Sequence, residues 1–535
     1  MSLHRALECL DVIEGIFQRF SSTREDRQTL ARAARVCKAF ADPALDALWE
    51  TLDDIIPAFR LLPSLAVVFD EHGFQVDVTF GIIPQDAWDR FQQYARRVRK
   101  LTVMSPASAL MEAPSRPLEQ LAQRGGGQVV FPRLERLTWR QEYLSRSNRN
   151  ILLLIPSSLE ALSIQGVIRD SGGETSWQWL EASQDLLRTI FSRAPRLQAF
   201  AISGIVHPRA LVSIRALPAL RQVHIVSRII NLQAIRVLAS FPYLVELSIH
   251  ARFTIPDNSG CIGFPVLKDL SVRGTQMEHT PELVNRLPSI ELTHLLSTIL
   301  SPSVRTLSAN IRADEDGQLE PLLSLIASKY RSLRVLSLEV DNAAPDTRSF
   351  SGVLRPLVSL RVLRIIRIRL LYSMLLPAEL LVDMAMAWPE AIEVTLFAET
   401  PSIDTSIPVD AVYVLTEFAR LCPKLETLEL PYLDFQHPPS LDTLTATKGH
   451  GLRSLGVSAY SNMSIEDHAQ VAHFVDTVFP KLAIDSQLNW LPLEEGYDSR
   501  MNWKRVLELM KELRRERESS SGQIGTRNSL GESNM

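Results

Sequence analysis

Hydrophobic and polar residues along most of the chain follow one short phrase that recurs. It reads Pro, one or two residues, Leu, two residues, Leu, one residue, then Ile, Val or Leu, and a few copies lack the proline. The copies lie at 98–103, 132–139, 156–164, 195–202, 218–225, 242–249, 265–272, 302–309, 331–338, 359–365, 389–396, 423–430 and 451–457. In the second half of each copy apolar and polar residues alternate, which is the period of a strand buried on one face. We therefore expect each copy to contribute a β-strand.

The segments between the copies have the pattern of amphipathic helices. They lie at 177–192, 232–239, 318–328, 378–387, 412–421 and 465–478. Ser464 and Asp467 are spaced like a capping box at the start of the last helix. The proline of each phrase cannot continue a helix, so it ends the preceding one and leads into the strand. Strand–turn–helix units in tandem cannot bury their apolar faces alone, and this predicts an α/β solenoid.

The phrase resembles the leucine-rich repeat, L-x-x-L-x-L-x-x-N/C-x-L, over residues 98–484. It departs from that repeat in spacing, which runs from 23 residues (Leu197 to Leu220) to 38 (Leu159 to Leu197). The Asn or Cys after the strand is also missing from nearly every copy, so a ladder of buried Asn side chains is not expected. The resemblance implies an irregular solenoid with parallel strands on its concave side and helices outside. Loop insertions are expected at 251–263 and 399–406.

Upstream of the repeats, the pattern changes to three short helices. The first covers about 10–20 and the second about 25–40. The third is expected to begin at Asp42-Pro43, with Asp as the N-cap and Pro in the first helical position. About fifty residues provide little core of their own. The module is therefore either a cap packed on the solenoid or a partner-binding module whose surplus apolar face another chain covers.

The residues of this module are similar to an F-box. The family pattern is roughly L-P-x-E-I-L-x-x-I-F, then V-C-[KR]-x-[WF], then a helix with L-W. The matching residues are Asp11, Val12, Ile13, Ile16, Phe17, Val36, Cys37, Lys38, Phe40, Leu48 and Trp49. At the start, Glu8-Cys9 stands in place of Leu-Pro. Cys37 is expected inside an apolar helix face, where a thiol behaves as a small hydrophobe.

The resemblance implies a substrate-recognition subunit of a Skp-cullin-F-box ubiquitin ligase. The F-box would dock a Skp-type adaptor, the adaptor would connect to the cullin complex, and the repeats would hold a target protein that the sequence does not identify. No covalent chemistry takes place on the chain in that scheme. The residues expected to contact the adaptor are Leu10, Val12, Ile13, Ile16, Phe17, Val36, Cys37, Phe40, Leu48 and Trp49. Two alternatives remain: a leucine-rich-repeat scaffold without ligase linkage, and an unrecognised enzyme.

Composition and charge narrow these alternatives. The chain has 535 residues, of which 78 are leucine, and a net charge of −4. The overall charge gives no basic footprint for nucleic acid. The four cysteines are far apart without a C-x-x-C pair, which is typical of a reducing compartment. No signal peptide is recognised, and the most apolar region, 360–387, carries too many charges for a membrane span. We expect a cytoplasmic or nuclear protein.

Motifs for catalysis or metal binding are missing from the sequence. It has no P-loop, G-x-G-x-x-G, G-x-S-x-G or H-E-x-x-H. Gly125-Gly126-Gly127 lacks the following Lys-Ser/Thr of a phosphate loop and is interpreted as a flexible loop. His468 and His473, five residues apart on a helix, do not share a face. We therefore expect no cofactor and no metal.

Target recognition is expected on the outward-facing columns of the strands. Those columns are mostly small and neutral, with a few charged or polar positions and no run of basic or aromatic residues. The candidates are Arg136, Gln222, His224, Glu246, Asp269, Arg364, Glu393 and Glu429.

The expected organisation has five parts. It consists of an F-box-like module (1–60), a connecting segment (61–97), the repeats (98–484), a C-terminal capping helix (485–518) and a disordered tail (519–535). The apolar face of the capping helix is expected at Trp503, Val506, Leu507, Met510 and Leu513.

Overall fold

A computed structural model describes most of the chain. The described residues are 9–20, 23–63, 65–69, 75–104, 115–141, 146–166, 176–203, 211, 214–215, 217–254, 260, 262–274, 286–313, 319–342, 352–373, 376–399, 409–431, 433–435, 449–457, 465, 467–486 and 498–528. They form two compact units, unit 1 ending at Thr254 and unit 2 beginning at Gly260. The border between the two units falls inside the predicted repeats.

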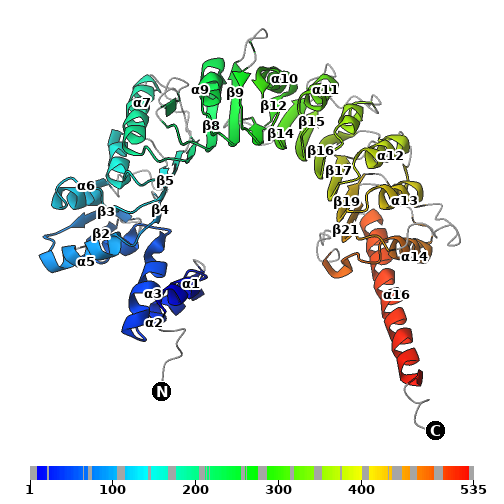
Figure 1. The fold of residues 1–535 in the computed structure, drawn as a ribbon, viewed down its shortest axis with the longest axis horizontal. Helices are drawn as coiled ribbons and strands as arrows, with labels where there is room; N and C mark the ends of the chain where they lie inside the picture. Colours follow the sequence, from blue (N-terminus) through cyan, green and yellow to red (C-terminus); the bar gives the residue numbers. More distant parts are fainter. Residues whose placement is uncertain are drawn as a thin grey trace. The chain divides into compact units, whose positions relative to one another are not determined.

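Each unit is built around a parallel sheet whose strands follow one another in sequence order (Figure 1). In unit 1 the strands are β1 (Thr51–Leu52), β4 (Lys100–Met104), β5 (Arg136–Gln141), β6 (Ala161–Gly166), β7 (Ala199–Ser203), β8 (Gln222–Asn231) and β9 (Glu246–Thr254). In unit 2 they are β11 (Asp269–Arg273), β14 (Thr306–Ala313), β15 (Val335–Asn342), β16 (Ile365–Ser373), β17 (Glu393–Glu399), β19 (Thr427–Leu430) and β21 (Ser454–Val457), with the short β12 (Leu287–Pro288) beside β14. Twelve of the thirteen predicted strands are confirmed, and the strand predicted from the copy at 359–365 is displaced, since β16 begins at Ile365.

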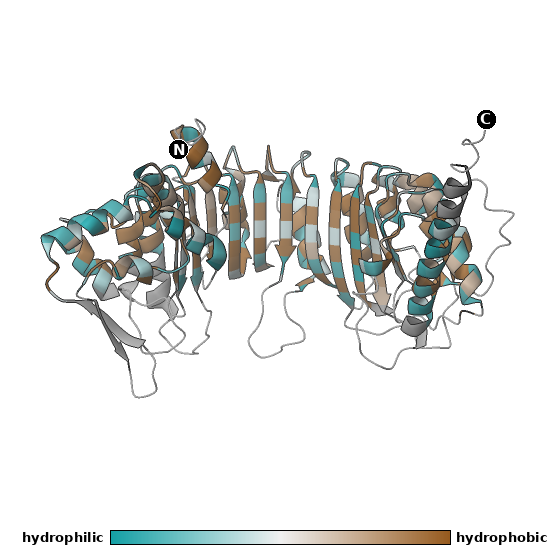
Figure 2. Cartoon of the chain, turned by 90° about the horizontal axis from the view of Figure 1, so that it is seen from below, coloured by the Kyte–Doolittle hydropathy of each residue, from teal (hydrophilic) through white to brown (hydrophobic). Residues whose placement is uncertain are grey.

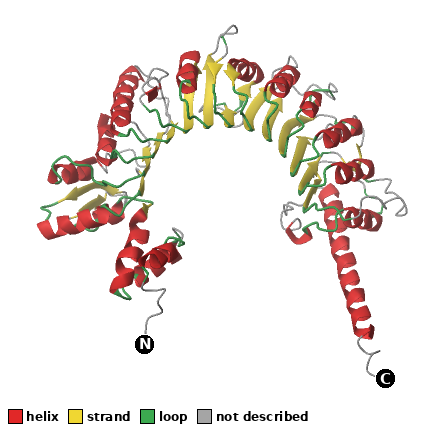
Figure 3. Ribbon diagram, in the orientation of Figure 1, coloured by secondary structure: helices red, strands yellow, loops and turns green. Residues whose placement is uncertain are grey.

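Helices cover one face of each sheet and leave the strands on the other side (Figure 3). Unit 1 has α6 (Ser115–Arg124), the 3-10 helix η2 (Arg146–Leu154), α7 (Ser176–Arg193) and α9 (Leu232–Ala239). Unit 2 has α10 (Ser289–Thr298), α11 (Leu319–Lys329), the 3-10 helix η4 (Arg355–Ser359), α12 (Ala378–Ala387), α13 (Ala411–Leu421) and α14 (His468–Val478). The helix at 465–478 therefore begins later than predicted. Its N-cap is Asp467, which accepts from the backbone N–H groups of Ala469 and Gln470, and Ser464 lies outside the described residues.

The repeated leucines explain this architecture. Leu220, Leu247, Leu333 and Leu428 are among the phrase residues buried in the layer between strands and helices. Their polar neighbours face the other way, so hydrophobic and hydrophilic bands alternate along the strands (Figure 2). Strand–turn–helix repeats that bury leucine at fixed positions of a parallel sheet define the leucine-rich-repeat solenoid fold.

Serine side chains tie neighbouring repeats together where an Asn ladder is absent. The Ser301 and Ser303 hydroxyls donate to the carbonyl oxygen of Leu267, at 3.2 and 2.9 Å. Ser332 donates to the Pro302 carbonyl at 2.6 Å. The bonds to Leu267, a buried residue, remove the cost of leaving its carbonyl acceptor unpaired, whereas the bond to Pro302 is exposed.

The predicted insertion at 251–263 is partly wrong. Strand β9 continues to Thr254, and Ile262–Gly263 form β10, which pairs with β13 (Ile299–Leu300). The reason is that Ala251 and Phe253 keep the alternation of buried positions beyond the phrase. Of the other predicted insertion, 399–406, only Glu399 is described, as the last residue of β17.

The N-terminal helices are α1 (Leu10–Phe17), α2 (Arg24–Ala33) and α3 (Lys38–Glu50). The predicted start of the third helix at Asp42-Pro43 is wrong, because α3 begins five residues earlier, at Lys38, and Pro43 lies inside it. The second helix likewise ends at Ala33 and not near Phe40. Pro43 is the sixth residue of α3 and lies beyond the first turn, so the helix lacks one N–H hydrogen bond at this position.

The segment between this module and the repeats is structured as well. It contains α4 (Ile56–Phe59), an antiparallel pair formed by β2 (Leu65–Phe69) and β3 (Gln75–Phe80), and α5 (Gln85–Ala95). Strand β1 follows α3 without a linker and pairs with β4 in parallel, Thr51 beside Lys100. The last helix of the module thus runs directly into the sheet.

The Gly125-Gly126-Gly127 segment ends α6. Gly126 and Gly127 have φ of 66° and 81°, and the Gly127 N–H donates to the Ala122 carbonyl at 2.7 Å. This is the left-handed turn that commonly closes a helix, and it gives the glycines a structural role.

The C-terminal helix α16 (Asp498–Asn528) packs on α14. Trp503, Val506, Leu507 and Met510 are buried, as predicted for a capping helix. The prediction of a disordered tail from Ser519 is wrong up to Asn528, where α16 ends. Residues 529–535 lie outside the described residues.

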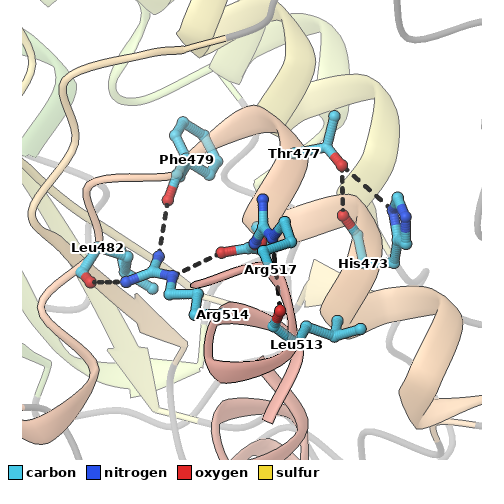
Figure 4. A network of polar contacts seen from close by, with 8 residues as sticks. His473, Thr477, Phe479, Leu482, Leu513, Arg514 and Arg517 are labelled. Carbon is cyan, nitrogen blue, oxygen red and sulfur yellow. Dashed lines mark hydrogen bonds and ion pairs between the residues drawn. The ribbon is translucent and has the colours of Figure 1, made fainter. Parts of the chain in front are cut away.

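A buried carboxylate fastens this helix. Asp476 of α14, only 3% exposed, accepts from Arg514 Nε at 2.7 Å and forms an ion pair with Arg517. Arg514 also donates to the carbonyl oxygens of Leu482 and Phe479, at 2.8 and 3.4 Å (Figure 4). Burial lowers the pKa of Arg514.

Candidate protein-interaction surfaces

The three N-terminal helices enclose a small core of their own. Ile13 and Phe17 of α1 pack with Leu30 of α2 and Ala44 of α3. Phe40 stands edge-on against Phe17, with ring centroids 5.6 Å apart. The matched residues Ile13 and Phe17 are therefore buried, and Phe40 and Leu48 are partly buried, so all four stabilise the module.

A second set of matched apolar residues is exposed. Leu10, Val12 and Ile16 of α1 and Val36 of the turn after α2 all present large hydrophobic side chains to solvent. Val12 and Ile16 are four residues apart and lie on one strip of the helix. Exposed apolar side chains beside a completed core have no role in the stability of the module itself.

Cys37 was expected inside an apolar helix face, and this expectation is wrong. The residue is exposed and is the N-cap of α3, where its side chain makes no capping hydrogen bond. The reason is the early end of α2 at Ala33, which places Cys37 in the connection between two helices.

The module is attached to the end of the connecting segment, just before the first repeat. Trp49 packs against Tyr94 of α5, with ring centroids 4.8 Å apart. Arg97 donates to the Asp42 carboxylate at 2.6 Å and forms a second ion pair with Asp46. Burial lowers the pKa of Arg97, but hydrogen bonds and Coulombic attraction from the two carboxylates outweigh it and raise the pKa overall. The guanidinium therefore stays charged and holds α3 against the start of β4.

The open strand face of unit 1 carries four of the predicted target-binding residues. Arg136 is exposed on β5. The Gln222 amide donates to Glu246 on the adjacent strand at 3.0 Å. His224 stands edge-on to His250, with ring centroids 5.0 Å apart. The strand ladder thus brings Gln222, His224 and Glu246 together and leaves Arg136 apart from them.

The prediction that Arg364 lies on the open strand face of unit 2 is wrong. In the ladder the residue beside Ser337 and Thr395 is Arg367, so the expected register at this repeat is wrong by three residues. Leu363, and not Leu360, occupies the first leucine position, and Arg364 lies before β16 in the helix-to-strand turn. Both leucines are buried, which is why the sequence pattern fits either register.

Arg367 and Glu393 form the best-defined ion pair of this face. The guanidinium Nε and Nη2 donate to the two carboxylate oxygens at 2.5 and 2.6 Å. The hydrogen bonds that Arg367 donates to Glu393 raise the pKa of Arg367. Next to this pair, Arg369 lies over the ring of Phe397, 5.3 Å from its centroid.

Glu429 is the electrostatically unusual residue of this face. It is partly buried on β19, and burial raises its pKa, with repulsion from Glu393 adding to the rise and Arg369 opposing it. Asp269, the remaining candidate, lies beside Thr306 at the first position of β11, away from this group. Sequence reasoning found Glu393 and Glu429 but missed Arg367, Arg369 and Phe397.

Within the described ranges, no group of three or more His, Cys, Asp and Glu residues is placed to hold a metal ion. Among the helices that the structure describes, none is long and apolar enough to cross a membrane. His468 and His473 bond separately, to Asn502 and Thr477.

Comparisons with known proteins add little. No protein-family profile matches the chain, and no curated protein matches it. Among solved structures, it is similar to an internalin from Listeria monocytogenes, with a TM-score of 0.33 and 12% identity over 76% of this chain and 88% of the internalin. The assignment to the leucine-rich-repeat fold therefore depends on the strand register and buried leucines described above.

Proposed function

We propose that this chain is a substrate-recognition subunit of a Skp-cullin-F-box ubiquitin ligase. Helices α1–α3 would bind a Skp-type adaptor, which connects to the cullin complex, and the repeats would bind the target protein. The chain itself would carry out no chemistry. Its contribution would be to hold target lysines near a charged conjugating enzyme, which raises their effective concentration.

One observation carries the proposal. Leu10, Val12, Ile16 and Val36 are exposed although the module already has its core in Ile13, Phe17, Leu30 and Ala44. Four exposed large apolar side chains on so small a module favour a protein partner, because covering each would contribute about 1–2 kcal/mol to binding.

The test is co-expression of the full chain with a Skp-type adaptor, followed by affinity capture. Substitutions I16D and V36D should abolish capture without unfolding the chain, since Ile16 is 46% and Val36 is 68% exposed. The matched control is I290D with V362D in unit 2, at residues of the same types that are 42% and 44% exposed. Phe17 and Trp49 are unsuitable for substitution, because both pack inside unit 1.

A repeat scaffold without ligase linkage is the second candidate. It is favoured by the start of α1, where Cys9 is the N-cap and makes no side-chain capping bond in place of the Leu-Pro of the F-box pattern. If the intact wild-type chain does not capture the adaptor, ligase linkage is excluded and the scaffold function is retained.

A further inference from the structure

The helix-to-strand turns of unit 2 carry an uninterrupted row of basic residues. Lys268, Arg305, Arg334 and Arg364 each stand one position before their strand, in β11, β14, β15 and β16. Backbone hydrogen bonds connect them in order: the Arg305 N–H donates to the Lys268 carbonyl at 2.8 Å, Arg334 to Arg305 at 2.7 Å, and Arg364 to Arg334 at 2.8 Å. We call these four residues the basic edge.

The four cations are close together. Neighbouring strands of a sheet lie about 4.8 Å apart, so the backbone positions of the four basic residues span about 14 Å. Like charges directly beside one another on adjacent strands destabilise a sheet. The fold accepts this repulsion at four consecutive repeats.

In the described part of unit 2, the positive charge of the basic edge is balanced by few carboxylates. All four residues are exposed. The nearest carboxylate is that of Glu390, 4.0 Å from Arg364, and it accepts two hydrogen bonds from Lys424, at 2.8 and 2.6 Å. Arg331 and Arg361, three residues before Arg334 and Arg364, are also exposed and add positive charge to the same turns.

In unit 1, the position just before each strand is occupied by residues of mixed charge. There the consecutive residues are Arg99, Glu135, Glu160, Gln198 and Arg221, connected by the same kind of backbone bond. Arg99 forms an ion pair with its neighbour Glu135. The position therefore accepts acidic, neutral and basic residues, and a run of four cations is not a requirement of the repeat.

We infer that the basic edge is a docking site for an acidic segment of a protein partner. This deepens the proposed function, because it assumes that the repeats hold a target protein and states which chemistry of the target they recognise. An extended segment with Glu or Asp at alternate positions presents a carboxylate about every 7 Å, so three carboxylates match the row. Bound there, the segment would relieve the repulsion among the four cations.

A protein partner fits better than nucleic acid. No aromatic side chain on which a base could stack stands in the row, and the chain carries a net charge of −4. A row that spans about 14 Å also falls short of the six to ten phosphate contacts usual for nucleic-acid affinity.

The test measures binding of the full chain to a fluorescein-labelled decapeptide of alternating Glu and Ser. A peptide of alternating Gln and Ser and a ten-nucleotide oligothymidylate serve as comparison probes. The single substitutions R305E and R334E should each weaken binding of the acidic peptide about tenfold, and added salt should weaken binding to the wild type. R221E, at the same repeat position in unit 1, should change the affinity less than about twofold.

Two further measurements make the outcome decisive. The melting temperatures of R305E and R334E should equal or exceed that of the wild type, because each new Glu stands between two cations. Both variants should capture the adaptor as the wild type does. A variant that loses only peptide binding therefore tests the basic edge. A wild-type chain that binds the peptide but does not capture the adaptor contradicts ligase linkage and leaves the basic edge unaffected.

The inference is overturned if R305E and R334E bind the acidic peptide as the wild type does. It is equally overturned if R221E weakens binding as much as they do, or if the Gln peptide binds as tightly as the Glu peptide. Tighter binding of oligothymidylate than of the acidic peptide would assign the edge to nucleic acid instead.

Discussion

The side chain of Glu429 lies directly over Gly456 on the next strand. A Cβ atom added at Gly456 would stand 2.8 Å from Glu429 Cγ and 3.1 Å from its Cβ. Gly456 is paired with Glu429 in the ladder, and the missing side chain lets the glutamate lie against the sheet. The space left by a glycine thus contributes to the partial burial of a carboxylate.

The first prediction concerns the carboxylate itself. Because Glu429 has a raised pKa in the folded chain, the folded state binds more protons than the unfolded state between the ordinary and the raised pKa. Its contribution to the free energy of unfolding therefore falls as the pH rises through that window. E429Q removes this loss, so its stability relative to the wild type should be greater at pH 7.5 than at pH 4. Denaturant unfolding at the two pH values measures the difference, and an E429Q effect that is equal at both would contradict the prediction.

Gly456→Ala tests the same contact from the other strand. It should destabilise unit 2 by about 1 kcal/mol, because the new Cβ overlaps atoms of Glu429 that are too near the backbone to move freely. The double variant G456A/E429A should recover most of that loss. If G456A is as stable as the wild type, the close contact is not present in solution.

The second prediction concerns the attachment of α16. Asp476→Ala leaves Arg514 partly buried without its carboxylate, and should lower the free energy of unfolding by about 3 kcal/mol. It should also make α16 sensitive to proteolysis, since the helix loses two ion pairs to α14. On the same helix, R505A is the control, because the exposed pair of Arg505 and Glu508 at 3.5 Å is worth less than about 0.5 kcal/mol. Equal effects of D476A and R505A would show that burial of Asp476 has no energetic consequence.

The third prediction distinguishes the cysteines. Burial raises the pKa of Cys422 to about 12, and its thiol lies 3.4 Å from the Ala385 carbonyl oxygen inside unit 2. Cys9 and Cys37 are exposed. A thiol reagent at pH 8 should therefore label Cys9 and Cys37 within minutes and Cys422 only after unfolding, as read by peptide mass spectrometry. Rapid labelling of Cys422 in the folded chain would contradict the structure.

The same labelling reports on the proposed adaptor site. Cys9 and Cys37 adjoin Leu10 and Val36 in sequence, so a bound adaptor should protect both thiols. Protection of neither thiol in a purified complex would place the adaptor elsewhere on the chain.

The sequence predicts the strands better than the helix ends and the surface clusters. The reason is that the residues that form each strand are also the residues that fill the core. Each phrase contains apolar residues that become buried, so twelve strands are located correctly and the strand of the copy at 359–365 is displaced. Register is weaker wherever the pattern overlaps itself. Leu360 and Leu363 each begin an L-x-x-[LI] run, and only the pairing with β15 selects Leu363. Arg364 was misplaced for that reason, and Arg367 was missed.

Helix ends and tertiary clusters were less predictable. Asp42-Pro43 has the residues of a helix start, yet contacts of α1 and α2 with α3 extend the helix back to Lys38. The basic edge is not predicted either, although Lys268, Arg305, Arg334 and Arg364 each follow the first apolar position of four successive phrases. Their proximity depends on stacking of the repeats, which a pattern along one repeat does not contain.

The pairing of β1 with β4 has a consequence for how the chain avoids self-association. An uncovered outer strand of a parallel sheet exposes a row of N–H and C=O groups to which another molecule can add a strand. Thr51 and Leu52 occupy that position on β4, and the N-terminal module holds them there through α3. Removal of residues 1–60 would therefore open the sheet to aggregation as well as delete the helices proposed to bind the adaptor.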